Sequence, residues 1–178
     1  MKKAMGLAAI LGMVAVAGVF AKGYPLVTEG KTGAKIQMNP CPSAPEYRAA
    51  VELQEYVKKI SGAVMNRSTY PAVFYRSTDK ADFIEILPAT MEYAKFLMPG
   101  AMRERLSAAK SDDAFYIKTD GNRILIIGKK PIGVLYGTYV LIENYLGVRW
   151  FHPGEDGEYC PRSKNLTLGE IDDFQEPT

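Results

Sequence analysis

Histidine is scarce in this sequence, which has one among 178 residues, together with two cysteines and one tryptophan. A zinc site of the His-Glu-x-x-His type needs two histidines on one helix, and a histidine triad would have to use His152. His152 is followed by Pro153 and Gly154, a combination that favours a turn. We therefore expect no metal site and no cofactor.

The sequence also lacks a nucleotide-binding motif, although residues 128–139, GKKPIGVLYGTY, have the glycine spacing of a phosphate loop. In such a loop a lysine and a hydroxyl residue follow the second glycine, because they bind the phosphates and magnesium. Val134 and Leu135 occupy those positions here, and no Gly-x-Gly-x-x-Gly fingerprint is present. We expect Gly128 to turn the chain, and Gly133 and Gly137 to let a helix lie close to a sheet.

Net charge is low once the start of the chain is set aside. Two lysines precede an uncharged stretch that ends at Phe20, so residues 1–21 are predicted to be a signal peptide cleaved after Ala21. A membrane anchor is the alternative, but the stretch is short for a span and rich in alanine and glycine. Cleavage would leave 157 residues with 20 basic and 20 acidic side chains. We expect an exported protein, periplasmic or extracellular, with no nucleic-acid partner and, after cleavage, no membrane partner.

Cys41 and Cys160 lie near the two ends of the predicted domain. In an oxidising compartment they could form a disulfide that ties these ends together, and two free thiols fit the spacing equally well. A disulfide would require Cα atoms within about 7 Å of each other.

A short strand is predicted at residues 34–38, followed by a helix. Ser43-Ala44-Pro45-Glu46 has the form of a capping box with proline in the first turn, and Gly62 is placed to end the helix. Apolar residues recur at helical spacing and are expected to pack on a sheet: Ala49, Leu53, Tyr56, Val57 and Ile60. Further strands are predicted at 72–75 and 82–87.

Residues 91–110 have helical composition interrupted by Pro99-Gly100, which indicates one broken helix or two short ones. Residues 115–119 and 123–127 flank Asp120-Gly121 and predict a hairpin. Its second strand has apolar residues at odd and even positions alike, so both of its faces are apolar. This is typical of a central strand covered on both faces.

Pro131 begins a predicted helix that ends at Gly147, and residues 148–151 are expected to lead as a strand into a turn at His152-Pro153-Gly154. Strands and helices mix without strict alternation. The predicted class is therefore α+β, with helices packed on a mixed β-sheet. Adjacent acidic residues at 112–113, 155–156 and 172–173 give no convincing acid–base pair, because neighbours on a strand point to opposite faces.

Several stretches resemble a known domain: DAFYI (113–117), TDGNRILI (119–126), GVLYGTY (133–139), ENYLGVRWF (143–151) and PGE (153–155). With AAVELQEY (49–56) and KISG (59–62), they resemble the N-terminal domain shared by α-glucuronidases and related bacterial exported proteins. They are more distantly similar to the domain that precedes the barrel in β-N-acetylhexosaminidases. The resemblance covers most of residues 34–176, and residues 88–111 depart from it.

This resemblance implies an α+β fold similar to the zincins and to the second domain of hexosaminidases, without a metal site. It also implies that the catalytic carboxylates belong to a (β/α)8 barrel after this domain, so no catalytic residue carries over. We expect a signal peptide (1–21), a polar lead-in (22–33), an accessory domain (34–171) and the start of a linker to the barrel (172–178).

The resemblance implies a non-catalytic N-terminal accessory domain of an exported glycoside hydrolase, with the catalytic barrel of the same polypeptide as partner and a plant or host polysaccharide as substrate. Residues 147–155, GVRWFHPGE, offer an indole face for stacking on a sugar and an arginine for a uronic acid. The candidate carbohydrate contacts are Arg149, Trp150, His152 and Glu155. The alternative is that Trp150 belongs to the core and Arg149 is a surface charge.

Two other functions remain open at this point. Eleven tyrosines on a short neutral chain suggest a stand-alone secreted carbohydrate-binding module, although Tyr56 and Tyr145 already have helical core positions. A degraded peptidase-like domain with only a structural role is the other possibility.

Overall fold

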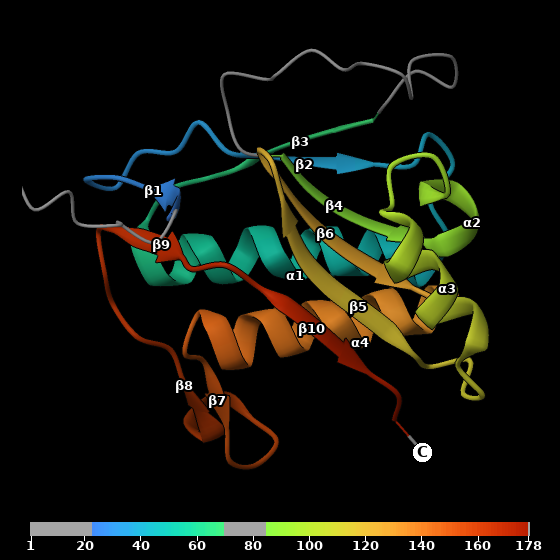
Figure 1. Ribbon diagram of the computed structural model, residues 1–178. Coiled ribbons are helices and arrows are strands. Elements are labelled where there is room, and N and C mark those ends of the chain that lie inside the picture. The colour runs from blue at the N-terminus through green and yellow to red at the C-terminus, as the bar shows by residue number, and fades with distance from the viewer. Residues whose placement is uncertain (1–22, 70–84, 178) are drawn as a thin grey trace, which may run out of the picture.

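A six-stranded mixed sheet forms the centre of the computed structural model, which describes residues 23–69 and 85–177 (Figure 1). The strand order is β10-β5-β6-β4-β2-β3. Neighbouring strands β6, β4, β2 and β3 run parallel, and β5 is antiparallel to both of its neighbours. The strands are β2 (Lys35–Met38), β3 (Asn66–Thr69), β4 (Glu85–Thr90), β5 (Phe115–Asp120), β6 (Arg123–Gly128) and β10 (Asp172–Gln175).

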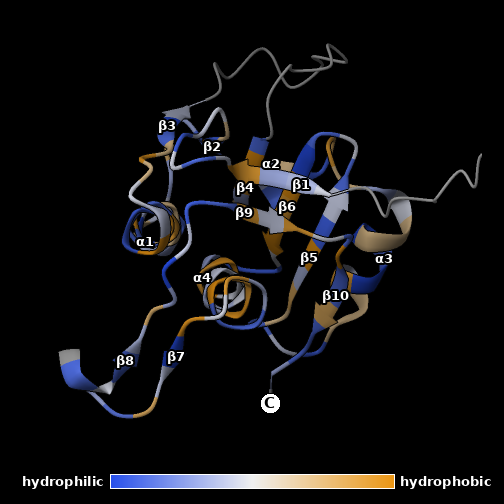
Figure 2. Ribbon diagram, turned by 90° about the vertical axis from the view of Figure 1, so that its left-hand side faces the viewer, coloured by the Kyte–Doolittle hydropathy of each residue, from blue (hydrophilic) through white to orange (hydrophobic). Residues whose placement is uncertain are grey.

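Helices cover both faces of this sheet, which confirms the predicted α+β class (Figure 2). On one face lie α1 (Ala44–Ser61) and α4 (Pro131–Val140), the latter continued by the π-helical turn η1 (Leu141–Tyr145). On the other lie α2 (Met91–Ala94) and α3 (Gly100–Ala108). None of the described helices is long and apolar enough to cross a bilayer.

Strand β6 separates two hydrophobic cores. Ile124 and Ile126 pack with α1 and η1, while Leu125 and Ile127 pack with α2 and α3. All four side chains are fully buried. The continuous apolar run in β6 thus reflects a central strand covered on both faces, as predicted.

Helix α1 begins and ends where its sequence indicates. The buried carboxylate of Glu46 accepts hydrogen bonds from the backbone N–H and the hydroxyl of Ser43, at 2.8 and 2.7 Å. Gly62 ends the helix with a left-handed φ of 82° and donates its N–H to the carbonyl of Lys58. The predicted apolar face of α1 is buried against the sheet.

One prediction left two alternatives open, and others fall outside the described residues. Residues 91–110 form two short helices, α2 and α3, which decides between the two alternatives. The signal peptide, the strand at 72–75 and residues 82–84 lie outside the described residues.

Two small sheets were not predicted, although one of their strands was, since β7 (Arg149–Trp150) lies within the strand expected at residues 148–151. Strand β1 (Tyr24–Val27) pairs with β9 (Leu166–Leu168), and β7 pairs with β8 (Glu158–Tyr159). The structure thus includes β1 within the residues assigned to the lead-in, and β10 within those assigned to the linker. Because β10 pairs with β5 along its length, the folded sheet extends to Gln175.

The structure holds both cysteines as free thiols, with Cys41 exposed and Cys160 half-buried, so the possible disulfide is not formed. Cys41 precedes the start of α1, whereas Ser163, three residues after Cys160, donates its backbone N–H to Ile60 near the helix end. The 18 residues of α1 span about 27 Å. A disulfide could not bridge the two ends of this helix.

Glycines set the distance between α4 and the sheet. A Cβ atom at Gly133 would lie 2.6 Å from the carbonyl oxygen of Ala114, and one at Gly137 would lie 3.0 Å from both Ile126 and Phe115. At Gly128 it would lie 2.3 Å from the backbone nitrogen of Val134, so this glycine also permits a close approach. The role predicted for Gly133 and Gly137 is therefore confirmed.

We expect Gly133→Ala to destabilise the protein by about 1–3 kcal/mol, because the added methyl group would meet backbone and force α4 off the sheet. Gly100→Ala is the matched control, since Gly100 lies in the first turn of α3 with open space around its Cβ position. There alanine should be neutral or slightly stabilising. Urea unfolding measures both changes, and equal midpoints for the two variants would contradict the packing role of Gly133.

Candidate functional site

The predicted sugar contacts lie on a two-stranded ribbon, β7–β8, that projects from the body of the protein near the end of α4 (Figure 1). The 3₁₀ turn η2 (Glu155–Gly157) connects its strands. Arg149 lies opposite Tyr159, and Trp150 lies opposite Glu158. Beyond β7 the N–H of Phe151 donates to the carbonyl of Gly157 at 2.8 Å, which closes the ribbon.

Trp150 attaches the ribbon to the body. Its half-buried ring makes edge contacts with Tyr56 of α1 and Tyr139 of α4, with centroids at 5.4 and 5.7 Å. The indole Nε1–H donates to the hydroxyl of Tyr56 at 3.0 Å. Aromatic pairs of this geometry add about 0.5–1.5 kcal/mol each beyond the area they bury. The indole therefore serves packing between two helices and the ribbon.

Glu158 continues this network on the facing strand. Its Oε2 accepts a hydrogen bond from the hydroxyl of Tyr56 at 2.7 Å, and its Oε1 lies 2.9 Å from Nζ of Lys59. Burial by itself raises the pKa of Glu158, but the hydrogen bonds from Tyr56 and Lys59 outweigh it and hold this pKa below its ordinary value. Burial and the neighbouring Glu158 carboxylate raise the pKa of Tyr56, so its hydroxyl stays protonated.

A second carboxylate, Glu52, lies between α1 and α4. It forms an ion pair with Arg48 one turn earlier in α1, and the hydroxyl of Tyr139 is hydrogen-bonded to the same pair. Burial, followed by the charge of Glu52, raises the pKa of Tyr139. The two carboxylates thus flank the three aromatic rings, and each has a basic partner.

The two faces of the ribbon differ. Trp150 and Glu158 form an inner face toward the helices, while Arg149, Phe151 and Tyr159 form an outer face. Arg149 is exposed and donates from Nη1 to the carbonyls of Glu143 and Val148, so its charge stabilises the end of η1.

His152 is exposed, with Nδ1 3.2 Å from the carbonyl of Pro153, and Glu155 contributes its backbone to η2. The structure thus places Arg149 and Trp150 on opposite faces of the ribbon. Contact of these four residues with a carbohydrate stays a prediction.

Phe151 and Tyr159, exposed by 75% and 56%, are the apolar members of the outer face that sequence reasoning did not identify. Strand alternation could have indicated Phe151, because successive side chains of a strand point to opposite faces and Trp150 points inward. Tyr159 gave no such signal because its strand has only two residues. Within residues 23–69 and 85–177, no three His, Cys, Asp or Glu side chains are arranged to hold a metal ion.

Tyr56→Phe should destabilise the protein by about 1–2 kcal/mol, because it removes the hydroxyl shared by Trp150 and Glu158. Tyr159→Phe, which removes an exposed hydroxyl, should leave the midpoint of urea unfolding nearly unchanged. Fluorescence of Trp150, the sole tryptophan, reports the transition at this site. Equal midpoints for the two variants would show that the hydroxyl of Tyr56 does not anchor the ribbon.

The low pKa of Glu158 predicts a pH dependence. Because the folded pKa lies below the unfolded value of about 4.3, the stability due to this carboxylate is complete above that pH and is lost as pH falls through the folded pKa. Glu158→Gln should be about 0.5–1 kcal/mol less stable at pH 7. The gap to the unsubstituted protein should close as pH falls below about 4.3.

Urea midpoints from pH 7 to pH 3 measure this gap. Glu55→Gln, at an exposed position of the same helix, is the control and should leave no comparable gap at pH 7. A Glu158→Gln gap that stayed constant down to pH 3 would exclude the assigned role of the carboxylate.

No protein-family profile and no protein of curated function matches the sequence. Among solved structures, this chain is similar to parts of several glycoside hydrolases. One is a family 115 4-O-methyl-α-glucuronidase with specificity for decorated arabinogalactans (TM-score 0.58, 16% identity, covering 86% of this chain and 18% of that one). Another is a family 20 β-N-acetylhexosaminidase from Streptomyces coelicolor (TM-score 0.45, 14% identity, 88% and 25% covered). At 16% identity the likeness to the α-glucuronidase shows the fold alone, and the chain spans a quarter or less of either enzyme.

Proposed function

We propose that this chain is a non-catalytic accessory domain of an exported, α-glucuronidase-like glycoside hydrolase, and that it packs against a catalytic (β/α)8 barrel of the same polypeptide. The observation that carries the proposal is the shared fold with the α-glucuronidase structure, over 86% of this chain and only 18% of that one. A plant or host polysaccharide is the substrate class of such an enzyme.

The carboxylates of the domain support a non-catalytic role. Glycosidases use two carboxyl groups on either side of a cleft, free to exchange protons with substrate. Here Glu52 is paired with Arg48, Glu85 with Arg123 at 3.0 Å, and Glu158 with Lys59. These pairs serve the attachment of helices, strands and ribbon.

The outer face of the ribbon, Arg149, Phe151 and Tyr159, is the surface that we assign to the barrel. Two exposed aromatic side chains beside an arginine are typical of the centre of a protein interface. In this arrangement the turn at His152 lies at the rim of the barrel's active site. The same exposed aromatics also fit the second candidate, a stand-alone secreted carbohydrate-binding module.

The coding DNA after Thr178 distinguishes these two functions. We expect several hundred codons in frame, with alternating strand and helix patterns and two catalytic acidic residues. The longer protein should release uronic acid from substituted xylo-oligosaccharides, while this chain alone should release none. An immediate stop codon, or hydrolysis by this chain alone, would contradict the accessory role.

The predicted signal peptide has its own test. N-terminal sequencing of the exported protein should give Lys22 as the first residue.

Within the longer protein, Phe151→Asp should separate one thermal unfolding transition into two, because it places a charge in the contact with the barrel. Val64→Asp is the matched control, since Val64 is also an exposed apolar residue, 53% exposed, and lies between α1 and β3. If both substitutions had the same effect, the outer face of the ribbon would not be the contact surface.

A further inference from the structure

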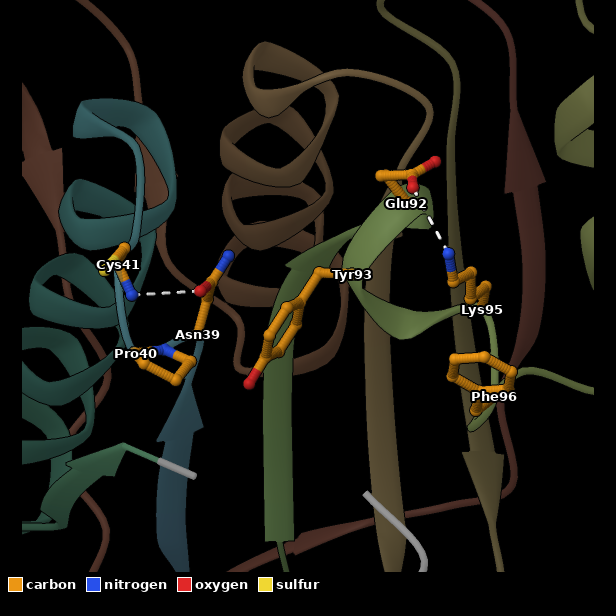
Figure 3. Close-up of a pocket in the computed structure, with 7 residues that line it drawn as sticks. All are labelled: Asn39, Pro40, Cys41, Glu92, Tyr93, Lys95 and Phe96. Carbon is orange, nitrogen blue, oxygen red and sulfur yellow. Dashed lines mark hydrogen bonds and ion pairs between the residues drawn. The ribbon is translucent and has the colours of Figure 1, made fainter. Parts of the chain in front are cut away.

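A pocket of about 410 Å3 lies beyond the carboxyl ends of β2 and β4 (Figure 3). From β2 the chain passes through α1 to β3 on one side, and from β4 it passes through α2 and α3 toward β5 and β6 on the other. Because α1 and α3 cover opposite faces of the sheet, the two connections diverge and leave a crevice. Such a switch point is where open sheets with parallel strands commonly bind ligands.

The two walls of this pocket are tied together by a buried side chain. One wall is the loop 39–41 after β2, and the other is α2 with the turn that follows it. Glu46, only 3% exposed, accepts the N–H of Ser43 through Oε2 and the N–H of Thr90 through Oε1, the latter at 2.9 Å. Thr90 precedes α2 directly, so one carboxylate fixes the starts of both helices. The pocket is therefore held in shape before a ligand binds.

The pocket lining combines apolar faces with balanced charge. Tyr93, Phe96 and Pro40 supply two aromatic rings and a pyrrolidine ring. Lys95 lies 3.4 Å from Glu92, and its Nζ lies 5.4 Å from the centre of the Phe96 ring. Figure 3 shows Tyr93 between the loop after β2 and the Glu92–Lys95 pair.

Asn39 provides an amide at the opposite wall, with its Oδ1 accepting the N–H of Cys41 at 3.0 Å. Burial and the charge of Glu46 raise the pKa of Tyr93, whose hydroxyl oxygen is itself buried, so Tyr93 offers the pocket its ring. The lining thus includes donors and acceptors on the side chains of Asn39, Glu92 and Lys95.

We propose that this pocket binds a neutral saccharide. A sugar ring has an apolar face for stacking on the exposed ring of Phe96, and vicinal hydroxyl groups that donate and accept toward Asn39, Glu92 and Lys95. The Glu92–Lys95 ion pair has no net charge, so it favours neither an anion nor a cation, and a neutral ligand leaves it intact. The volume lies within the range of about 300–1,000 Å3 for small-molecule sites. This proposal does not depend on the accessory role.

Cys41 provides a direct test, because its exposed thiol lies in the pocket wall. In a Cys160→Ser background, Cys41 is the only thiol that reacts with dithiobis(nitrobenzoate). Xylotetraose or triacetylchitotriose should slow this reaction by the factor 1 + [L]/Kd, about threefold at a concentration of twice Kd. Calorimetric titration with the same sugars gives a readout that does not involve Cys41.

Phe96→Ala should abolish both the protection of Cys41 and the heat of binding, since it removes the ring on which the sugar stacks. Tyr136→Ala is the control, because Tyr136 is another exposed aromatic residue, 40%, but lies on α4 away from the pocket lining. Two charged or non-sugar probes, potassium glucuronate and p-nitrophenol, complete the design. Equal protection by either probe would overturn the neutral-saccharide assignment. A lack of both protection and heat with the two sugars would do the same, as would retained binding in Phe96→Ala.

Discussion

The close approach of α4 to β5 and β6 determines where the other features of this domain lie. With hydrogen atoms in place of side chains at Gly133 and Gly137, the helix rests on Phe115, Ile126 and the backbone of Ala114. This approach sets the position of Tyr139 near the end of α4, and of η1 after it. Trp150 then packs against Tyr139, so the ribbon occupies its place because the helix lies this near the sheet.

The opposite end of the sheet depends on a different constraint. Strands β2 and β4 are parallel neighbours whose chains leave toward different faces, and this topology separates the starts of α1 and α2. The half-buried backbone N–H groups of Ser43 and Thr90 need an acceptor at this divergence, and Glu46 supplies it to both helix starts. A capping residue of α1 therefore also fixes the loop after β4, and the pocket between them is a consequence of chain direction.

Much of the fold could be predicted from local signals. Ser43 and Glu46 indicate the start of α1, Gly62 indicates its end, and the apolar run in β6 indicates a strand with two covered faces. The first strand of the ribbon was expected at residues 148–151, but its partner β8 could not be predicted in this way, since a strand of two residues carries no measurable periodicity. Strand β10 lies within the residues expected to start a linker, because the resemblance places a barrel directly after this domain and no local pattern indicates pairing with β5.

The candidate sites were less accessible to sequence reasoning, because each combines elements far apart in the chain. The helical spacing of Tyr56 indicates a core residue of α1, and Tyr56 is buried. Its hydroxyl also joins Trp150 to Glu158, about a hundred positions later in the chain. The pocket at Tyr93 requires knowledge of strand order, which no local pattern contains.

Strand alternation also constrains what the ribbon can present to a partner. Since Trp150 and Glu158 face inward and are committed to Tyr56, Tyr139 and Lys59, they cannot turn outward without breaking that network. The outer face is therefore fixed as Arg149, Phe151 and Tyr159. In our proposal the indole positions the ribbon, and the residues on either side of it make the contacts.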